Sequence, residues 1–391
     1  MTQEENKSSS LYVKLIPVML AFFAMGFVDS VGIATNYVKS DFALSDKVAN
    51  LCPSMVFFWF LVCSVPTGML MNKIGRRKTV LISLGLTIIA LILPMLSYSF
   101  AGMMISFAFL GIGNAVLQVS LNPLVSNIVS GDKLASFMTF GQFVKAIASF
   151  IAPLLAAWGA AYFGNWKLMF PIFALEALLA FIFLVKEDIK EEEITGKPST
   201  FKECFALLGD GTILLCFIGI MCHVGVDVGT NVSAPKILMD RLGWTLAQAV
   251  YATSLYFIFR TIGCFSGSFL LAKFSAKIIF IVSVTMMLLA MCGLLVFHTQ
   301  WPIYACIALI GLGNSNIFPI IFSQALLHMP TKKNEVSGLM IMGIIGGTVF
   351  PLVMGVASDA LGSQTGSVIV MSAGVLYLLA IAGKIKKAAS A

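Results

Sequence analysis

Residues 57 to 94 read FFWFLVCSVPTGMLMNKIGRRKTVLISLGLTIIALILP. Two apolar runs are separated here by a short turn that carries Lys73, Arg76, Arg77 and Lys78. Each run, together with its flanking residues, is long enough for a helix that crosses a bilayer, which needs about 20 apolar residues. Basic residues remain on the cytoplasmic side of a membrane. The segment therefore predicts two membrane-spanning helices with a cytoplasmic connection.

The same pattern continues along the whole chain. Hydrophobic residues make up 59% of its 391 residues and charged residues 11%, whereas a soluble domain carries about 25% charged residues. This composition excludes a soluble enzyme. The eight cysteines show no metal-ligand spacing, so we expect neither a metal site nor a disulfide. We predict twelve spans, at residues 13–38, 47–71, 79–98, 102–127, 134–162, 167–185, 212–236, 247–272, 276–297, 302–327, 336–358 and 366–384.

The distribution of basic residues predicts the orientation. Most of the 25 lysine and arginine residues fall in connections on one side of the predicted membrane, which places both termini in the cytoplasm. The net charge of +7 follows from this topology and does not indicate nucleic-acid binding. One connection, residues 186–210, is long and polar. It divides the chain into an N-terminal six-helix bundle (1–185) and a C-terminal six-helix bundle (211–391).

The two halves also resemble each other in sequence, at an offset of about 200 residues. Gly111-Ile112-Gly113-Asn114 of span 4 matches Gly311-Leu312-Gly313-Asn314 of span 10, and Asp29 of span 1 matches Asp227 of span 7. An even number of spans in each half makes the repeat a parallel one. Parallel repeats related by an axis along the membrane normal occur in major facilitator transporters, whose substrate site lies between the halves near the midplane.

Several motifs agree with that architecture. Residues 68–78, with Gly68, Gly75, Arg76 and Arg77, resemble the gating-loop signature of the major facilitator superfamily, although Asn72 stands where that signature usually has aspartate. Within the superfamily, residues 314–322 and 337–359 resemble spans 10 and 11 of the fucose:proton symporter family of sugar permeases. The resemblance implies an all-α fold of twelve transmembrane helices in two pseudo-symmetric bundles, and transport of a sugar.

Five ionisable residues fall inside predicted spans. Such residues are costly in a bilayer and usually mark a solute or proton path. They are Asp29, Lys145, Glu176, Asp227 and Arg260. Polar stripes at helical spacing accompany them: Asn114, Gln118 and Asn122 in span 4, Gln142 and Lys145 in span 5, and His223, Asp227 and Asn231 in span 7. These stripes predict helix faces that line a water-filled cavity, while the alternative is hydrogen bonding between packed helices.

Two residues depart from the pattern that the resemblance implies. Its essential acids are an aspartate in span 1, matched by Asp29, and a glutamate in span 4, where this chain has Gln118. Lys145 replaces an asparagine in span 5. Lys145 binds the carboxylate of an acidic sugar, such as a uronic or sialic acid, or it pairs with Asp29 and couples proton binding to solute binding, and the two readings are compatible within one transport cycle.

We therefore predict a secondary active sugar importer, with proton coupling through Asp29 and Lys145. Sodium coupling, or efflux of drugs or metabolites, is the alternative. We expect no enzymatic activity and no cofactor besides a co-transported proton. The expected setting is a bacterial cytoplasmic (inner) membrane, with the protein a monomer and a small sugar and the lipid bilayer its partners. The predicted substrate-binding residues are Asn36, Gln118, Asn122, Gln142, Lys145, Asp227, Asn231, Arg260, Asn314 and Asn316.

Overall fold

The computed structural model describes residues 3–44, 48, 51–129, 131, 133–187, 189, 191, 199–244, 249 and 251–385. All regular secondary structure in these residues is helical. Twelve helical segments are long and apolar enough to cross a membrane, which confirms the predicted fold class. They run Lys14–Thr35, Leu51–Ile74, Arg76–Leu96, Phe100–Ile128, Lys133–Phe163, Trp166–Lys186, Gly211–Leu242, Tyr251–Lys273, Ala276–Val296, Gln300–His328, Pro330–Leu361 and Thr365–Lys384.

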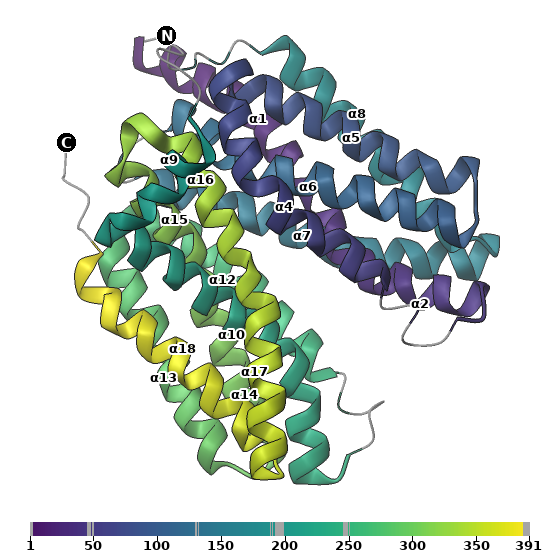
Figure 1. Ribbon diagram of the computed structural model, residues 1–391, viewed down its shortest axis with the longest axis vertical. Helices are drawn as coiled ribbons and strands as arrows, with labels where there is room; N and C mark the ends of the chain where they lie inside the picture. Colours follow the sequence, from purple (N-terminus) through teal and green to yellow (C-terminus); the bar gives the residue numbers. More distant parts are fainter. Residues whose placement is uncertain are drawn as a thin grey trace. The chain divides into compact units, whose positions relative to one another are not determined.

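The chain forms two compact units (Figure 1). Unit 1 comprises Met1–Ser130, Gly141–Cys204 and Lys332–Met342, and unit 2 comprises Gly131–Phe140, Phe205–Thr331 and Gly343–Ala391. Two spans are therefore shared: the first residues of span 5 belong to unit 2, and the first residues of span 11 belong to unit 1. The predicted division at residues 186–210 stays a prediction.

The helices of unit 1 are α1 (Gln3–Gly26), η1 (Phe27–Ser30), α2 (Val31–Asp41), α4 (Leu51–Ile74), α5 (Arg76–Leu96), α6 (Phe100–Ile128), most of α7 (Lys133–Phe163), η2 (Trp166–Leu168), α8 (Met169–Lys186) and α16 (Lys333–Met342). Helix α9 (Phe201–Ala206) lies within the predicted linker, residues 186–210. Unit 2 contains η3 (Leu207–Gly209), α10 (Gly211–Leu242), α12 (Tyr251–Lys273), α13 (Ala276–Val296), α14 (Gln300–Asn314), α15 (Ile317–His328), η5 (Gly343–Ile345), α17 (Gly346–Leu361), α18 (Thr365–Ile381) and η6 (Ala382–Lys384).

Three spans are interrupted near their centres. A 3₁₀ turn, η1, breaks span 1 at Phe27–Ser30, residues 315–316 separate α14 from α15, and η5 separates α16 from α17. In η1 the hydroxyl of Ser30 donates to the carbonyl oxygen of Phe27, at 2.6 Å, and so replaces part of the lost helical bonding. Interrupted helices are where transporters commonly place polar groups, and η1 carries Asp29.

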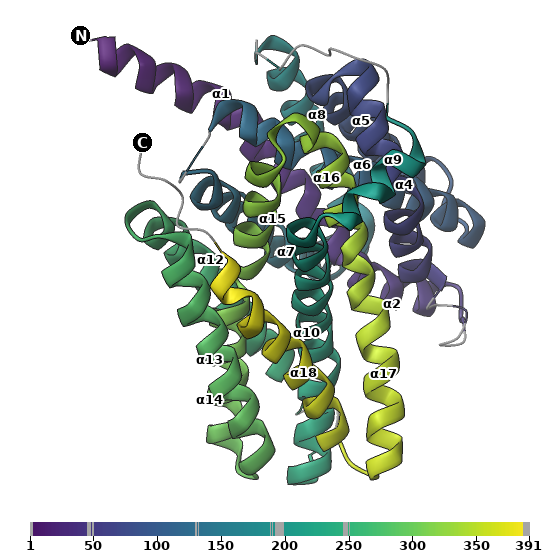
Figure 2. The ribbon, with the colours of Figure 1, turned by 60° about the vertical axis from the view of Figure 1, so that its left-hand side comes forward.

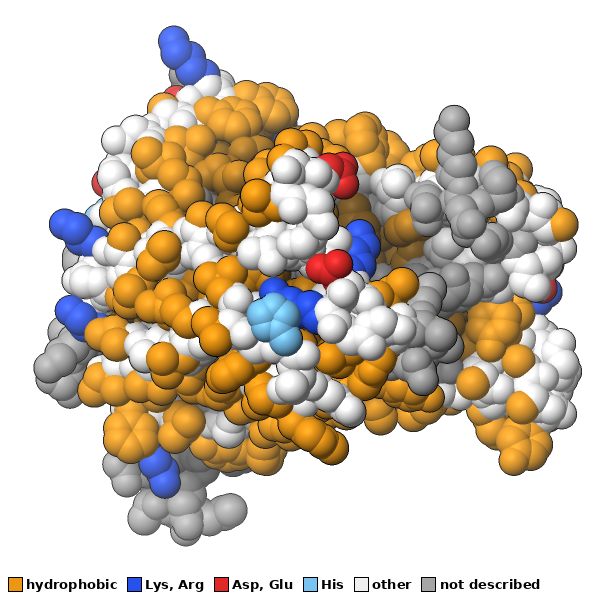
Figure 3. Space-filling model, turned by 90° about the horizontal axis from the view of Figure 1, so that it is seen from below, with side chains coloured by type: hydrophobic (Ala, Val, Ile, Leu, Met, Phe, Trp, Pro, Cys, Tyr) orange, Lys and Arg blue, Asp and Glu red, His pale blue; other side chains and the backbone are white. Residues whose placement is uncertain are grey.

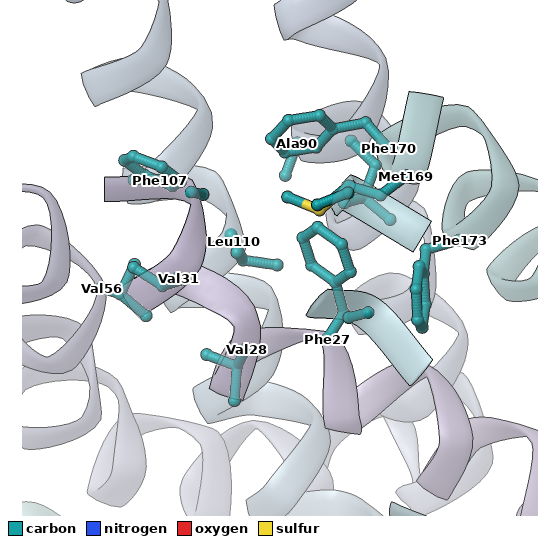
Figure 4. Close-up of a cluster of buried hydrophobic side chains, with 14 of the residues drawn as sticks. Phe27, Val28, Val31, Val56, Ala90, Phe107, Leu110, Met169, Phe170 and Phe173 are labelled. Atoms are coloured by element: carbon teal, nitrogen blue, oxygen red, sulfur yellow. The ribbon is translucent and has the colours of Figure 1, made fainter. Parts of the chain in front are cut away.

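Aromatic packing holds span 1 against α8 in unit 1. The ring centroids of Phe27 and Phe173 lie 4.8 Å apart, and those of Phe27 and Phe170 lie 5.5 Å apart. Figure 4 shows these rings together with Val28, Val31 and Leu110 in one buried cluster. The cluster fixes the broken part of span 1 on its apolar side, so Asp29 projects from the opposite side.

Glycines set the same close helix contacts in both units. A Cβ at Gly111 of α6 would lie 2.5 Å from the carbonyl oxygen of Val56, and one at Gly311 of α14 would lie 2.7 Å from that of Tyr256. Helix α6 packs on α4 and α5, and α14 packs on α12 and α13 (Figure 2). The internal repeat in the sequence therefore corresponds to a repeat of packing.

The outer surfaces of the helices are apolar. Figure 3 shows one face on which hydrophobic side chains predominate and charged side chains are few. Exposed large side chains include Phe58 of α4, Leu175 of α8 and Phe269 of α12. Such surfaces suit contact with hydrocarbon and are uncommon on soluble monomers.

A substitution at Gly26 tests the contact that positions Asp29. A Cβ here would overlap the carbonyl oxygen of Lys145 and lie 2.7 Å from the Cβ of Ala148. Because overpacking costs about 1–3 kcal/mol, we expect Gly26→Val to lower the thermal unfolding temperature of the purified protein. Gly32→Val is the control, since a Cβ at Gly32 meets nothing within 4 Å. Equal unfolding temperatures for the two variants would contradict the packing.

Candidate functional site

Asp29 and Lys145 form an ion pair in unit 1. The Lys145 Nζ lies 3.5 Å from Asp29 Oδ2, and their side chains are 18% and 36% exposed, respectively. Ser149, one turn after Lys145 on α7, donates its hydroxyl to the same Asp29 oxygen at 2.7 Å. The geometry therefore realises the pairing alternative of the two that the sequence left open for Lys145. Asp29 is thus a partly exposed carboxylate inside a span.

Three amide side chains of α6 form a chain of hydrogen bonds in unit 1. Asn114 donates to the carbonyl oxygen of Met25 at 3.0 Å, and Gln118 donates to Asn114 Oδ1 at 2.8 Å. Asn122 donates to the Gln118 carbonyl oxygen at 2.9 Å. All three residues are buried. In this conformation the stripe serves helix packing, while Asn122 Oδ1 has no partner among the described residues.

Unit 2 holds a longer polar network. Arg260 of α12 lies 3.2 Å from Asp227 of α10, and the hydroxyl of Tyr256 donates to Asp227. Asn314 donates to the Tyr256 oxygen at 3.1 Å, and its Oδ1 lies 2.8 Å from His223 Nδ1. Three helices, α10, α12 and α14, thus meet through one chain of hydrogen bonds and one ion pair. Asp227 and Arg260, both predicted to bind substrate, are thus paired with each other in this structure.

Asn231 and Asn316 add two unsatisfied acceptors in unit 2. Asn231 donates to the Asp227 carbonyl oxygen at 3.0 Å, and its Oδ1 is buried without a partner among the described residues. Asn316, between α14 and α15, likewise has a buried Oδ1 without a partner among the described residues. Buried polar atoms without partners are uncommon in proteins and call for an explanation. Each of these two oxygens retains the capacity to accept a hydrogen bond.

The structure gives less detail for the remaining predicted residues. Gln142 is half-buried on α7. Asn36 lies in α2, but its side chain lies outside what the structure describes. Glu176 of α8 has both carboxylate oxygens buried without a partner among the described residues, so it joins neither ion pair. In the same unit, Tyr37 stacks on Trp166 with ring centroids 4.9 Å apart.

The gating loop is held by a network within unit 1. Asn72 donates to Glu335 of α16 at 2.6 Å, and Asn334 donates to Asn72 Oδ1 at 2.6 Å. Arg76 donates through Nε to Asn334 at 2.7 Å. Glu335 is buried and also accepts from Ser199. The negative charge that the superfamily signature usually places at position 72 is thus supplied by Glu335 instead.

Glycines and the second arginine complete this network. A Cβ at Gly68 would lie 2.7 Å from the carbonyl oxygen of Asn334, so α4 and α16 approach closely there. Gly75 has a φ of +88°, a conformation that favours glycine. Arg77 donates to the carbonyl oxygens of Leu184 and Val185 at the end of α8, at 3.0 and 2.6 Å. The loop therefore joins α4, α5, α8 and α16.

Asp210, a titratable residue outside the spans, lies at the start of α10. Asp210 is the N-cap of that helix and accepts from the backbone N–H groups of Thr212 and Ile213. The hydrogen bond from Ile213 holds the pKa of the Asp210 carboxyl below its usual range, and His328 lowers this pKa further. The contact ties α10 to the end of α15 within unit 2.

Sequence reasoning did not identify Ser149, Ser199, Asn334 and Glu335 as site residues. Ser149 stands four residues after Lys145, and this spacing on a helix was the available signal. Glu335 lies near the predicted start of span 11, where it resembles an ordinary interfacial acid. Its role depends on a contact across more than 260 residues of sequence, which no local pattern encodes.

Known proteins resemble this chain in sequence and in fold. A family model described as Major Facilitator Superfamily matches residues 18–342. The chain belongs to this superfamily of membrane transporters. It is 27% identical over 374 residues to a glucose/galactose transporter of Brucella abortus, covering 89% of this chain and 88% of the relative. Membership confirms the predicted superfamily and agrees with the expectation that the chain is not an enzyme.

Solved structures show the same fold. A crystal structure of FucP, a major facilitator transporter, in the outward conformation matches with a TM-score of 0.81, at 17% identity, covering 96% of this chain and 99% of that chain. The proton:xylose symporter XylE matches with a TM-score of 0.74, at 16% identity, covering 97% of each chain. At these identities the likeness establishes the fold. The chain is accordingly a multi-pass membrane protein.

A tyrosine substitution tests the network of unit 2. Tyr256→Phe removes the hydroxyl that donates to Asp227 and accepts from Asn314. Buried groups left unsatisfied cost about 1–3 kcal/mol each, so we expect a lower thermal unfolding temperature. Tyr251→Phe on the same helix is the matched control, because Tyr251 is exposed. The network is wrongly assigned if both variants unfold at the same temperature.

Exchanging the charges at positions 72 and 335 tests the pairing of Asn72 with Glu335 in the gating loop. Asn72→Asp sets a second carboxylate against Glu335, where two like charges at hydrogen-bond distance destabilise each other. We expect Asn72→Asp to lower the unfolding temperature and the double variant Asn72→Asp/Glu335→Gln to restore most of it, since glutamine then donates to aspartate. Differential scanning fluorimetry of the three proteins measures this. A double variant no more stable than Asn72→Asp alone would refute the pairing.

Proposed function

We propose that this protein is a secondary active transporter that imports a neutral sugar, of hexose size, in symport with a proton by alternating access. The observation that carries the proposal is the partly exposed Asp29–Lys145 ion pair, inside a broken span, with Ser149 on the same carboxylate oxygen. A bacterial cytoplasmic membrane, with both termini in the cytoplasm, and a monomer complete the proposal.

The buried polar groups of this chain and the names of its relatives support a sugar as the substrate. Buried acceptors without partners at Asn122, Asn231 and Asn316 suit a solute with many hydroxyl donors. The Brucella relative is named a glucose/galactose transporter. FucP is a fucose:proton symporter and XylE a proton:xylose symporter. An apolar drug would leave these amide groups unsatisfied, so the geometry does not favour efflux of hydrophobic compounds.

Charge compensation favours a neutral sugar over an acidic one. Lys145 is paired with Asp29, and Arg260 is paired with Asp227, so each pair carries no net charge. An anionic sugar would have to displace a carboxylate from its own cation. A neutral sugar instead accepts a hydrogen bond from Lys145 once Asp29 is protonated, and it brings no second carboxylate into the site.

We infer coupling between proton and sugar from the competition of Asp29 and the sugar for Lys145. Protonation of Asp29 removes the charge that holds Lys145 in place, so its ammonium group becomes available to donate to sugar hydroxyls. Sugar binding to Lys145 in turn favours the protonated form of Asp29. This reciprocity is required by linkage: if the proton raises sugar affinity, the sugar raises proton affinity by the same factor.

Transport in proteoliposomes tests this coupling. We expect the parent to accumulate glucose or galactose when a proton gradient is imposed. Asp29→Asn should lose accumulation and keep sugar exchange without a gradient, because asparagine mimics the protonated acid. Asp359→Asn is the control, since Asp359 is exposed on α17 and lies outside both networks.

The alternatives give different results in the same assay. Accumulation driven by a sodium gradient alone, or an unimpaired Asp29→Asn, would overturn proton coupling at Asp29. Accumulation of glucuronate without glucose would overturn the neutral substrate class. Export of a hydrophobic dye without any sugar uptake would overturn the sugar proposal as a whole.

A further inference from the structure

A cavity of about 160 Å³ lies at the N-terminus of α13, and all its lining residues belong to unit 2. Lys273, Ser275 and Gln324 contribute the polar groups of its wall. Cavities that hold drug-sized ligands measure about 300–1,000 Å³, whereas one water occupies about 30 Å³. The cavity is therefore suited to a small polyatomic group. None of its residues belongs to the ion pairs described above.

The corresponding place in unit 1 is occupied by an anion. Helix α5 begins at Arg76, and the backbone N–H groups of Arg76 and Arg77 donate to the two oxygens of the Glu191 carboxylate, at 2.6 and 2.7 Å. Backbone N–H groups in the first turn of a helix have no partner within the helix. The linker carboxylate satisfies them and also suits the positive end of the helix dipole.

Helices α5 and α13 are equivalent in the repeat. Both have 21 residues. Gly113 packs against Ser83 and Thr87 of α5, and Gly313 packs in the same way against Ser283 and Met287 of α13. The N–H groups of Ala276 and Lys277 in unit 2 therefore correspond to those of Arg76 and Arg77 in unit 1. Unit 1 shows which kind of group this position binds.

The unit 2 position has the donors without the carboxylate. Ser275 is the N-cap of α13, but its hydroxyl makes no capping bond, and its Oγ is buried without a partner among the described residues. No described group accepts from the backbone N–H of Ala276 or Lys277. Lys273 lines the same cavity, together with Ser275 and Ala276 of the helix start. A buried hydroxyl, a helix N-terminus and a lysine thus border one small space.

We propose that this cavity binds a phosphate group, held by Ser275, Lys273 and the first turn of α13. Helix N-termini bind phosphate because their N–H groups point at the ligand and their dipole favours negative charge. The group comes either from a lipid headgroup, since the cavity lies at the end of two spans, or from free phosphate in solution. The site is separate from the proposed sugar pathway.

Thermal shift of the delipidated protein in detergent tests the proposal. Two probes separate the sources: inorganic phosphate against chloride at equal ionic strength, and short-chain phosphatidylglycerol against diacylglycerol with the same acyl chains. We expect phosphatidylglycerol, phosphate or both to raise the unfolding temperature by several degrees. A rise with phosphate assigns a soluble ligand, a rise with the lipid alone assigns a headgroup, and a rise with neither overturns the site.

Three variants make the result specific. Lys273→Gln should weaken the apparent affinity about tenfold, because a hydrogen bond to a charged group contributes about 1.5–3 kcal/mol. Lys73→Gln is the matched control at the equivalent position of unit 1, where Glu191 already fills the place, and should leave the affinity unchanged. Ser275→Asp supplies an internal carboxylate, so it should raise the unfolding temperature without ligand and remove the further rise. Equal losses for both lysine variants would overturn the assignment.

One further variant tests whether the chain supplies its own anion. Asp132 follows the lining residue Gly131 in sequence and lies outside the described residues. If Asp132 fills the cavity, the parent shows no shift and Asp132→Asn acquires one. That outcome would overturn an external ligand. A shift of equal size in the parent and in Asp132→Asn supports it.

Discussion

The high cost of an uncompensated charge in hydrocarbon governs the interior of this protein. Insertion scales place that cost at about 2.5–3.5 kcal/mol for an ionised side chain at the centre of a span. Among the described residues, four of the five ionisable side chains predicted inside spans form two ion pairs, Asp29 with Lys145 and Asp227 with Arg260, and the fifth, Glu176, has no partner. Removing one partner of either pair leaves the other as an unpaired charge. Within unit 1, η1 is therefore tied to α7, and within unit 2, α10 is tied to α12, by electrostatics as well as by packing.

Glycine contacts make these pairs possible. Gly26 lets span 1 reach the backbone of α7 at Lys145, one turn before Asp29, and Gly311 lets α14 reach α12 at Tyr256 and Arg260. Close backbone approach through small residues is the usual way in which membrane helices pack. Here the same approach brings a polar side chain within reach of its partner. Packing and polarity are thus set by the same positions, so a change at one glycine disturbs both.

The fold could be predicted largely from the sequence, because length and hydropathy determine spans almost independently of context. The pairing of Asp29 with Lys145 was also within reach, since both are ionisable residues of opposite charge inside predicted spans, where an unpaired charge is costly. The network of Tyr256, Asn314 and His223 could be suggested only as polar stripes, because stripes do not say which helices face each other. Glu335 shows the limit most clearly: its partner Asn72 is distant in sequence, and Asn72 itself looked like the loss of a charge.

The two ion pairs differ in a way that the repeat does not require. Asp29 and Asp227 are equivalent positions, but the cation comes from α7 in unit 1 and from α12 in unit 2. The Asp29 side chain is 36% exposed and Asp227 only 14%. Asp227 also accepts from Tyr256, which in turn is bonded to Asn314. Changing the charge of Asp227 would therefore disturb several buried partners, whereas a proton can reach Asp29 from water and alters one ion pair and one serine contact. The proposed proton step at Asp29 rests on this difference in exposure and bonding between two acids at equivalent positions of the repeat.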